Sequence, residues 1–140
     1  MKRKRKAGFT LVEILVVIAI IALIGSFALP TITKRLGFAK KSLVKSKMTL
    51  IEGALDQFMI DCGRYPADDE GFEVLLVAPE DLEEKWGGPY LKRSQILDPW
   101  GNPYIYVEEG VVNMGSYDIV SLGADGAEGG EGDDEDVFND

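Results

Sequence analysis

Apolar residues follow three different patterns along the chain. The first pattern is continuous, because Phe9 to Leu29 contains 21 residues with a single charge, Glu13. As a helix such a run is roughly 31 Å long, which matches the hydrocarbon core of a bilayer. A transmembrane helix is therefore predicted over residues 9–29.

After Pro30 the apolar residues take the spacing of an amphipathic helix. They recur at intervals of three, four and seven residues, as Leu36, Leu43, Leu50, Ile51, Ala54, Leu55, Phe58 and Met59. This spacing places them on one face of an α-helix. Gly63 and Pro66 end it, because glycine adopts the left-handed cap and proline cannot continue a helix. The amphipathic helix, about residues 31–62, is expected to continue the membrane helix.

The remaining part, about residues 63–122, has short elements between turns. Asp68 or Asp69 is expected to cap a short helix over Glu70–Val77, with Phe72, Leu75 and Leu76 on its buried side. Dense Gly, Pro and Asp signals precede Tyr104–Val107, which predicts a strand. Tyr117–Leu122 predicts a second strand whose two faces alternate. We therefore expect an α+β fold of the type IV pilin kind, in which a long helix packs on a small antiparallel β-sheet.

The composition excludes several classes of protein. The 140 residues include no histidine and one cysteine, Cys62, and the net charge is -9. The length allows one small domain, and a lone cysteine forms no intrachain disulfide. Without histidine the common nucleophile pairs and the usual zinc sites are missing, so we expect no enzyme activity. The acidic balance argues against nucleic-acid binding.

The two ends of the chain carry opposite charge. Residues 2–6 are all Lys or Arg, whereas residues 125–140 contain eight acids and no base. Under the positive-inside rule the basic leader stays cytoplasmic and the part after Pro30 faces the other side. The glycine-rich acidic tail is expected to be disordered unless a cation neutralises it. The first half of the amphipathic helix is basic, with side chains that either stay solvated or meet lipid phosphates or acidic neighbours. These bases are Lys34, Arg35, Lys40, Lys41, Lys45 and Lys47.

Glu13 distinguishes between interpretations of the apolar run. A secretory signal peptide cut near Ser26–Ala28 and an ordinary signal anchor both leave this carboxylate unexplained in hydrocarbon. A cut between Gly8 and Phe9 would instead place the new α-amine of Phe9 one helical turn from Glu13. The partner of the carboxylate is then that amine or the same amine of a neighbouring subunit, and only the second fixes the register between subunits.

The segment from Lys6 to Glu13, followed by an apolar helix, resembles the class III leader of type IV pilins and pseudopilins. The resemblance implies that a prepilin peptidase removes residues 1–8 and N-methylates Phe9. It also implies that Glu13 sets the register of a filament whose core is built from the helices of residues 9–29. Without its leader the chain would carry a net charge of -14.

Four turn motifs narrow the resemblance to the general secretion pathway protein G family, the major pseudopilins of type II secretion. They are Arg64–Pro66, Asp98–Gly101, Tyr117–Asp118 and Ser121–Gly126, in that order. The resemblance implies a single-pass inner-membrane protein with a periplasmic domain, residues 30–140, that polymerises with copies of itself. The implied partners are minor pseudopilins, an inner-membrane platform with its ATPase, and an outer-membrane secretin. A minor pseudopilin, an adhesive pilin and a Sec-secreted calcium-binding protein are the alternatives.

The acidic loop of residues 122–140 also has an implied role. Ca²⁺ takes six to eight oxygen ligands, and closely spaced acids on a glycine-rich loop can supply them. The resemblance implies one Ca²⁺ held by the carbonyls of Leu122 and Ala127 and the side chains of Asp125 and Asp136. The extra acids, chiefly Asp133 and Glu135, leave the other ligands open, and the tryptophan that the family usually has after Asp136 is absent. A disordered acidic end without metal is the alternative.

Overall fold

The computed structural model describes residues 8–139, and the side chains of all of these except residues 27–36. The basic leader that the sequence predicts therefore lies almost wholly outside the described residues. The chain divides into two compact units, Met1–Leu36 and Gly37–Asp140. One long helix, α1 (Leu11–Cys62), contributes to both. The prediction that the apolar run and the amphipathic helix form one element is confirmed.

Local capping explains where α1 begins and ends. The backbone N–H of Glu13 donates to the Thr10 hydroxyl at 3.2 Å, and the Thr10 N–H donates to the Glu13 carboxylate at 3.5 Å. This is a capping box. At the other end Gly63 has a φ of 83°, and its N–H donates to the carbonyl of Met59 at 2.8 Å. The predicted stop after Cys62 is thus confirmed.

Among the residues that the structure describes, no helix is both long and apolar enough to cross a membrane. The transmembrane assignment of residues 9–29 stays a prediction.

The face of α1 that meets the rest of Gly37–Asp140 is the expected one at Ile51, Ala54, Leu55 and Phe58, and differs from it elsewhere. The buried side chains are Val44, Met48, Ile51, Ala54, Leu55, Phe58 and Cys62. Leu43, Leu50 and Met59, which the sequence placed on the same face, are exposed. The reason is that α1 carries apolar residues in more than one stripe, and periodicity alone cannot say which stripe meets the sheet.

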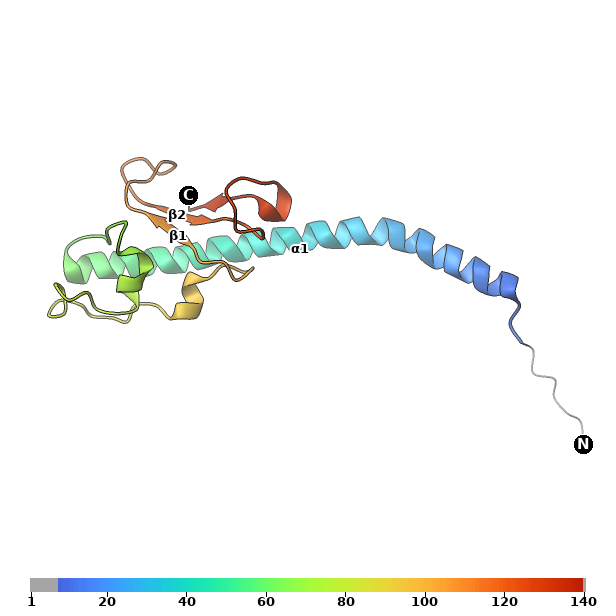
Figure 1. Cartoon of the computed structure of the whole chain (residues 1–140), viewed down its shortest axis with the longest axis horizontal. Helices are drawn as coiled ribbons and strands as arrows, with labels where there is room; N and C mark the ends of the chain where they lie inside the picture. Colours follow the sequence, from blue (N-terminus) through green and yellow to red (C-terminus); the bar gives the residue numbers. More distant parts are fainter. Residues whose placement is uncertain (1–7, 140) are drawn as a thin grey trace, which may run out of the picture. The chain divides into compact units, whose positions relative to one another are not determined.

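A three-stranded antiparallel sheet lies against this part of α1. Its strands are β1 (Ile105–Val107), β2 (Asp118–Ser121) and β3 (Val137–Phe138), with β2 in the centre (Figure 1). The two predicted strands are confirmed, whereas β3 was not foreseen. The expected alternation along the second strand is wrong, because all four residues of β2 are buried. Its polar side chains are buried because loop groups bind them, as described below.

Three short 3-10 helices lie between these elements: η1 (Gly71–Leu75), η2 (Arg93–Ile96) and η3 (Gly132–Asp134). In place of the helix predicted over Glu70–Val77, the chain therefore forms only the five-residue 3-10 helix η1. Neither predicted capping arrangement forms, since Glu70 is at the N-cap without a side-chain cap bond. The Asp68 carboxylate instead accepts from the Glu108 N–H at 2.6 Å. The predicted burial of Phe72 and Leu75 is confirmed.

Candidate functional site

The N-terminal candidate residues lie at the start of α1. Gly8, Phe9 and Glu13 are all exposed, with Phe9 at 78 %. The large apolar residues from Leu11 to Ile24 are exposed as well. A continuous apolar surface of this kind is typical of contact with lipid or with other subunits. The structure shows that Glu13 also takes part in the capping box at the start of α1. The Thr-x-x-Glu spacing of Thr10 and Glu13 is the sequence signal that predicts such a box.

The C-terminal candidate residues lie on the loop between β2 and β3. Gly123 opens this loop with a φ of 66°, and a Cβ there would lie 2.6 Å from the carbonyl carbon of Asp134. Only glycine allows so close an approach in this conformation. The Ala124 N–H then donates to the carbonyl of Asp133 at 2.9 Å. The acidic tail therefore folds back on itself.

Two of the predicted Ca²⁺ ligands accept hydrogen bonds within this loop. Asp125 Oδ1 accepts from the Ala127 N–H at 3.1 Å, and Asp136 Oδ2 accepts from the Gly129 N–H at 2.9 Å. The other carboxylate oxygen of Asp136, Oδ1, is buried and has no hydrogen-bond partner among the described residues. A buried, unpaired carboxylate oxygen is costly, so it is a natural place for a cation to bind.

The two less definite ligands point elsewhere. Glu135 forms an ion pair with Lys41 of α1, and the Asp133 carboxylate lies against Gly37 of α1. Throughout the described part of the chain, no three Asp, Glu or Cys side chains are close enough together to hold a metal ion. Any cation at Asp136 would thus depend largely on oxygen atoms other than those of carboxylates.

The bases of α1 whose side chains the structure describes contact loops of the chain and the short strand β3. Lys45 donates to the carbonyl of Phe138 at 2.8 Å and Lys47 to that of Leu97 at 2.7 Å. The ammonium group of Lys40 lies 5.3 Å from the ring centre of Trp100. These lysines therefore attach loops and the strand β3 to the helix, in addition to any contact with solvent.

The Asp-Pro-Trp-Gly turn supports the start of the acidic loop. Asp98 is buried, and its Oδ1 accepts from the N–H groups of Trp100 and Asn102 at 3.0 and 2.9 Å. Its Oδ2 accepts from the hydroxyl of Ser121 on β2 at 2.8 Å. The Asn102 side chain then donates to the carbonyl of Gly123 at 2.8 Å. One turn thereby holds both the end of β2 and the first residue of the loop.

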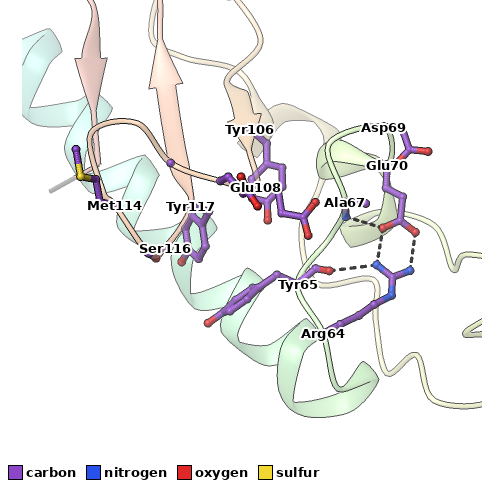
Figure 2. A pocket seen from close by; sticks show the side chains of 13 residues that line it. Arg64, Tyr65, Ala67, Asp69, Glu70, Tyr106, Glu108, Met114, Ser116 and Tyr117 are labelled. Atoms are coloured by element: carbon purple, nitrogen blue, oxygen red, sulfur yellow. Dashed lines mark hydrogen bonds and ion pairs between the residues drawn. The ribbon is translucent and has the colours of Figure 1, made fainter.

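A cleft of about 1040 Å³ opens beside the end of α1 (Figure 2). Arg64 makes two hydrogen bonds to the Glu70 carboxylate, at 2.6 and 2.7 Å, which hold the pKa of Glu70 below its ordinary value. The rings of Tyr65 and Tyr117 lie 5.2 Å apart, and burial raises the pKa of Tyr117. None of the site residues predicted from the sequence is among the described residues that line this cleft. The Arg64–Pro66 motif thus has a structural role here.

Comparison with known proteins places these features in one family. The family model described as type II secretion system (T2SS), protein G, matches residues 31–140, and the prokaryotic N-terminal methylation motif matches residues 3–29. The chain belongs to the type II secretion system protein G family. The prediction made from the leader and the turn motifs is confirmed.

Relatives match over almost the whole chain. The type II secretion system core protein G of Pseudomonas aeruginosa is 38% identical over 142 residues, which cover 99% of this chain and 98% of that protein. The protein of the same name from Vibrio cholerae is 39% identical over 140 residues, covering 99% and 94%. A crystal structure of the major pseudopilin from the type 2 secretion system of enterohaemorrhagic Escherichia coli superimposes with a TM-score of 0.58 at 30% identity. The match covers 72% of this chain and 86% of that one.

In this member of the family, sequence reasoning missed the role of the last described residue. Asn139 is buried, and its side-chain oxygen accepts from the Ile119 N–H at 2.6 Å while its amide donates to Glu52 of α1 at 3.0 Å. Its carbonyl accepts from the Asn113 side chain at 2.6 Å. Asn139 therefore connects the end of the acidic loop to β2, to α1 and to the β1–β2 connection.

Proposed function

We propose that the chain is a structural subunit that polymerises into the pseudopilus of a type II secretion system, and that it catalyses no reaction. The observation that carries this function is the match to the protein G family over the domain and to the methylation motif at the N-terminus. The exposed apolar surface from Leu11 to Ile24 supports it, because such a surface needs lipid or other subunits to cover it.

The precursor would be a single-pass protein of the inner membrane, with its basic leader in the cytoplasm and residues 30–140 in the periplasm. A prepilin peptidase would cut between Gly8 and Phe9 and methylate the new amine. Both residues are exposed and precede the first residue of α1, so the peptide bond is not part of the helix.

Mass spectrometry of the mature N-terminus tests the processing step. Expression with the secretion apparatus should yield a chain that begins with N-methyl-Phe9. A chain that begins at Leu29 would instead indicate a cleaved secretory signal, and an intact Met1 would exclude processing. Replacement of the five leader bases by Gln should impair insertion and orientation, and leave the domain folded.

The partners in this proposal are other copies of the chain, minor pseudopilins at the tip, the inner-membrane platform with its cytoplasmic ATPase, and the outer-membrane secretin. Addition of subunits would lengthen the filament and push folded substrates through the secretin. The work of the chain is then mechanical and needs only assembly contacts and a stable domain.

A Ca²⁺ ion would stabilise the acidic loop in this proposal. The ligands would be the carbonyls of Leu122 and Ala127 and the side chains of Asp125 and Asp136, since hard cations prefer oxygen. The unpaired, buried Asp136 Oδ1 supports the assignment. Asp133 and Glu135 would join only after leaving their contacts with Gly37 and Lys41.

Thermal unfolding of the full chain in detergent tests the metal. We expect Ca²⁺ to raise the melting temperature relative to chelator, because it binds the folded state alone. Asp136→Asn should abolish that increase, whereas Glu128→Gln, an exposed control on the same loop, should keep it. The same melting temperature in Ca²⁺ and in chelator for the unaltered chain would refute the assignment.

A further inference from the structure

The described residues that line the cleft beside the end of α1 all follow that helix in the sequence. We call it the tyrosine cleft, because Tyr65, Tyr106 and Tyr117 are among them. Its volume of about 1040 Å³ matches the largest clefts that usually bind ligands. The proposed function gives this cleft no role.

The three tyrosines of the tyrosine cleft form one group of contacting rings. The ring centre of Tyr117 lies 5.8 Å from that of Tyr106 and 5.2 Å from that of Tyr65. The Tyr65 hydroxyl donates to Asp56 of α1 at 3.0 Å, and the Tyr106 hydroxyl donates to the carbonyl of Pro66 at 3.0 Å. Tyr65 and Tyr106 thus offer ring surface rather than free hydroxyl donors, and the faces of aromatic rings attract cations.

Three carboxylates line the same cleft without a basic partner. They belong to Asp69, Glu108 and Glu109, which are exposed, and the ion pairs among the described residues involve other acids. The base of the lining, Arg64, binds Glu70. In the view of Figure 2, Glu108 lies between Tyr117 and Glu70. The described lining thus has four acids and one base, and the base is neutralised by one of the acids.

Backbone donors beside the tyrosine cleft are already engaged. The Glu108 N–H donates to Asp68 at 2.6 Å, and the Gly110 N–H donates to the carbonyl of Ser116 at 2.8 Å. The Ser116 N–H donates to the carbonyl of Asn113 at 3.0 Å. An anion needs free donors, whereas an ammonium or guanidinium group needs only acceptors. Charge and hydrogen bonding therefore both favour a cationic ligand.

Hydrogen bonds within the chain fix both sides of the tyrosine cleft. On one side the Glu70 carboxylate accepts from Arg64 and from the Ala67 N–H, the latter at 2.8 Å. On the other side the buried Asp118 accepts from the N–H groups of residues 111–113. Because the cleft is formed in advance, binding costs little ordering of the protein.

The cleft also offers an adaptable apolar contact. Met114 lines it and is 89 % exposed, and a flexible methionine fits surfaces of different shape. A Lys or Arg side chain combines an apolar stem with a charged head, so it matches rings, methionine and carboxylates together. A metal ion matches less well, because no three acid side chains of the described part are close enough to hold one.

We propose that the tyrosine cleft binds a Lys- or Arg-containing segment of another protein. The basic head groups meet Asp69, Glu108 and Glu109, and their apolar stems lie against the tyrosine rings and Met114. The cleft is larger than one such side chain requires, so neighbouring residues of the segment enter it as well. This inference goes beyond the proposed function and does not depend on assembly through α1.

Isothermal titration calorimetry of the full chain in non-ionic detergent, at constant Ca²⁺, tests the class of ligand. The probe is a blocked peptide of alternating Gly and Arg, and the matched probe has Gln in place of Arg. The Arg peptide should bind at least tenfold more tightly, and added salt should weaken its binding. Equal affinities would overturn the proposal. Spermidine that binds more tightly than the Arg peptide would show that a small amine is the occupant, and would also overturn it.

Substitution of the carboxylates tests the place of binding. Glu108→Gln with Glu109→Gln should weaken binding of the Arg peptide at least tenfold, and Asp69→Asn, on the segment before η1, should weaken it too. Glu83→Gln with Glu84→Gln is the matched control, because it removes two adjacent exposed acids outside the cleft. The control should leave the affinity unchanged. Equal weakening by the two double variants would indicate a general attraction to an acidic domain and refute the site.

The same measurements separate the tyrosine cleft from the proposed function. Melting temperatures equal to that of the unaltered chain would show that the variants fold. A chain that assembles into filaments and does not prefer the Arg peptide refutes the cleft alone. Binding of the Arg peptide by Glu13→Ala, a variant expected not to assemble normally, would show that the single subunit carries the site.

Discussion

At the scale of single residues, Asp118 shows how one carboxylate orders a loop. It is 1% exposed and accepts from the N–H groups of Val111, Val112 and Asn113 at 2.7, 2.9 and 2.9 Å. Burial, the largest influence, raises its pKa, but the backbone donors and the Asn113 amide together outweigh burial and lower it. The sequence identified Asp118 as a strand residue and as part of a family motif, but not its role in ordering the loop, because its partners lie on a loop whose path depends on the carboxylate itself.

We expect Asp118→Asn to destabilise the fold by about 2 kcal/mol at pH 7, because an amide has one acceptor oxygen for four donors. The folded-state pKa is lowered, so the contribution of the carboxylate is present above the unfolded pKa and is lost as the pH falls through the folded one. Urea titrations of both proteins at pH 7 and at about pH 3 measure this. The difference between them should shrink in acid, and a difference independent of pH would contradict the role of the charge.

At the scale of elements, local sequence signals were enough to predict α1 but not enough to predict all three strands of the sheet. Gly63 fixes the end of the helix through its own backbone, so the sequence predicted that end correctly. The strand β3 has two residues, and it forms only because Val120 pairs with Phe138 across the acidic loop. Such distant pairing leaves no periodic signal. The predicted Ca²⁺ ligands came from family resemblance, and the structure adds the unpaired oxygen of Asp136.

Asn139→Ala should detach β3 from β2, because Asn139 bonds the Ile119 N–H and Glu52. We expect a loss of roughly 2 kcal/mol of unfolding free energy. Hydrogen exchange should become faster at the amides of Ile119 and Ser121 and stay unchanged at those of η1, which lies outside this network. Glu131→Gln, an exposed change on the acidic loop, is the matched control. Unaltered exchange on β2 would show that the strand pairing alone holds the C-terminal end.

At the scale of the whole molecule, assembly and folding depend on different residues. The core of Gly37–Asp140 uses one stripe of α1, while the exposed apolar residues of Leu11–Ile24 have no role in that core. The lysines that attach the loops and β3 to the helix are Lys41, Lys45 and Lys47, and they lie on the domain's part of α1. Changes at the N-terminus of α1 should therefore affect the filament and leave the domain's melting temperature unchanged.

Glu13 is the residue at which this separation can be measured. Its carboxylate accepts from the Thr10 N–H, so it could serve only as a cap, whereas the proposed function makes it the partner of a neighbouring Phe9 amine. Glu13→Ala removes both roles, while Thr10→Ala removes the side-chain half of the capping box and keeps the carboxylate. If the carboxylate fixes the register, Glu13→Ala abolishes or misregisters filaments and Thr10→Ala assembles normally.

Filament yield by electron microscopy, with the melting temperature as the folding control, measures the effect of the two substitutions. Equal loss of filaments in the two variants would show that Glu13 acts only as a helix cap. Full assembly of Glu13→Ala would show that Glu13 does not set the register between subunits.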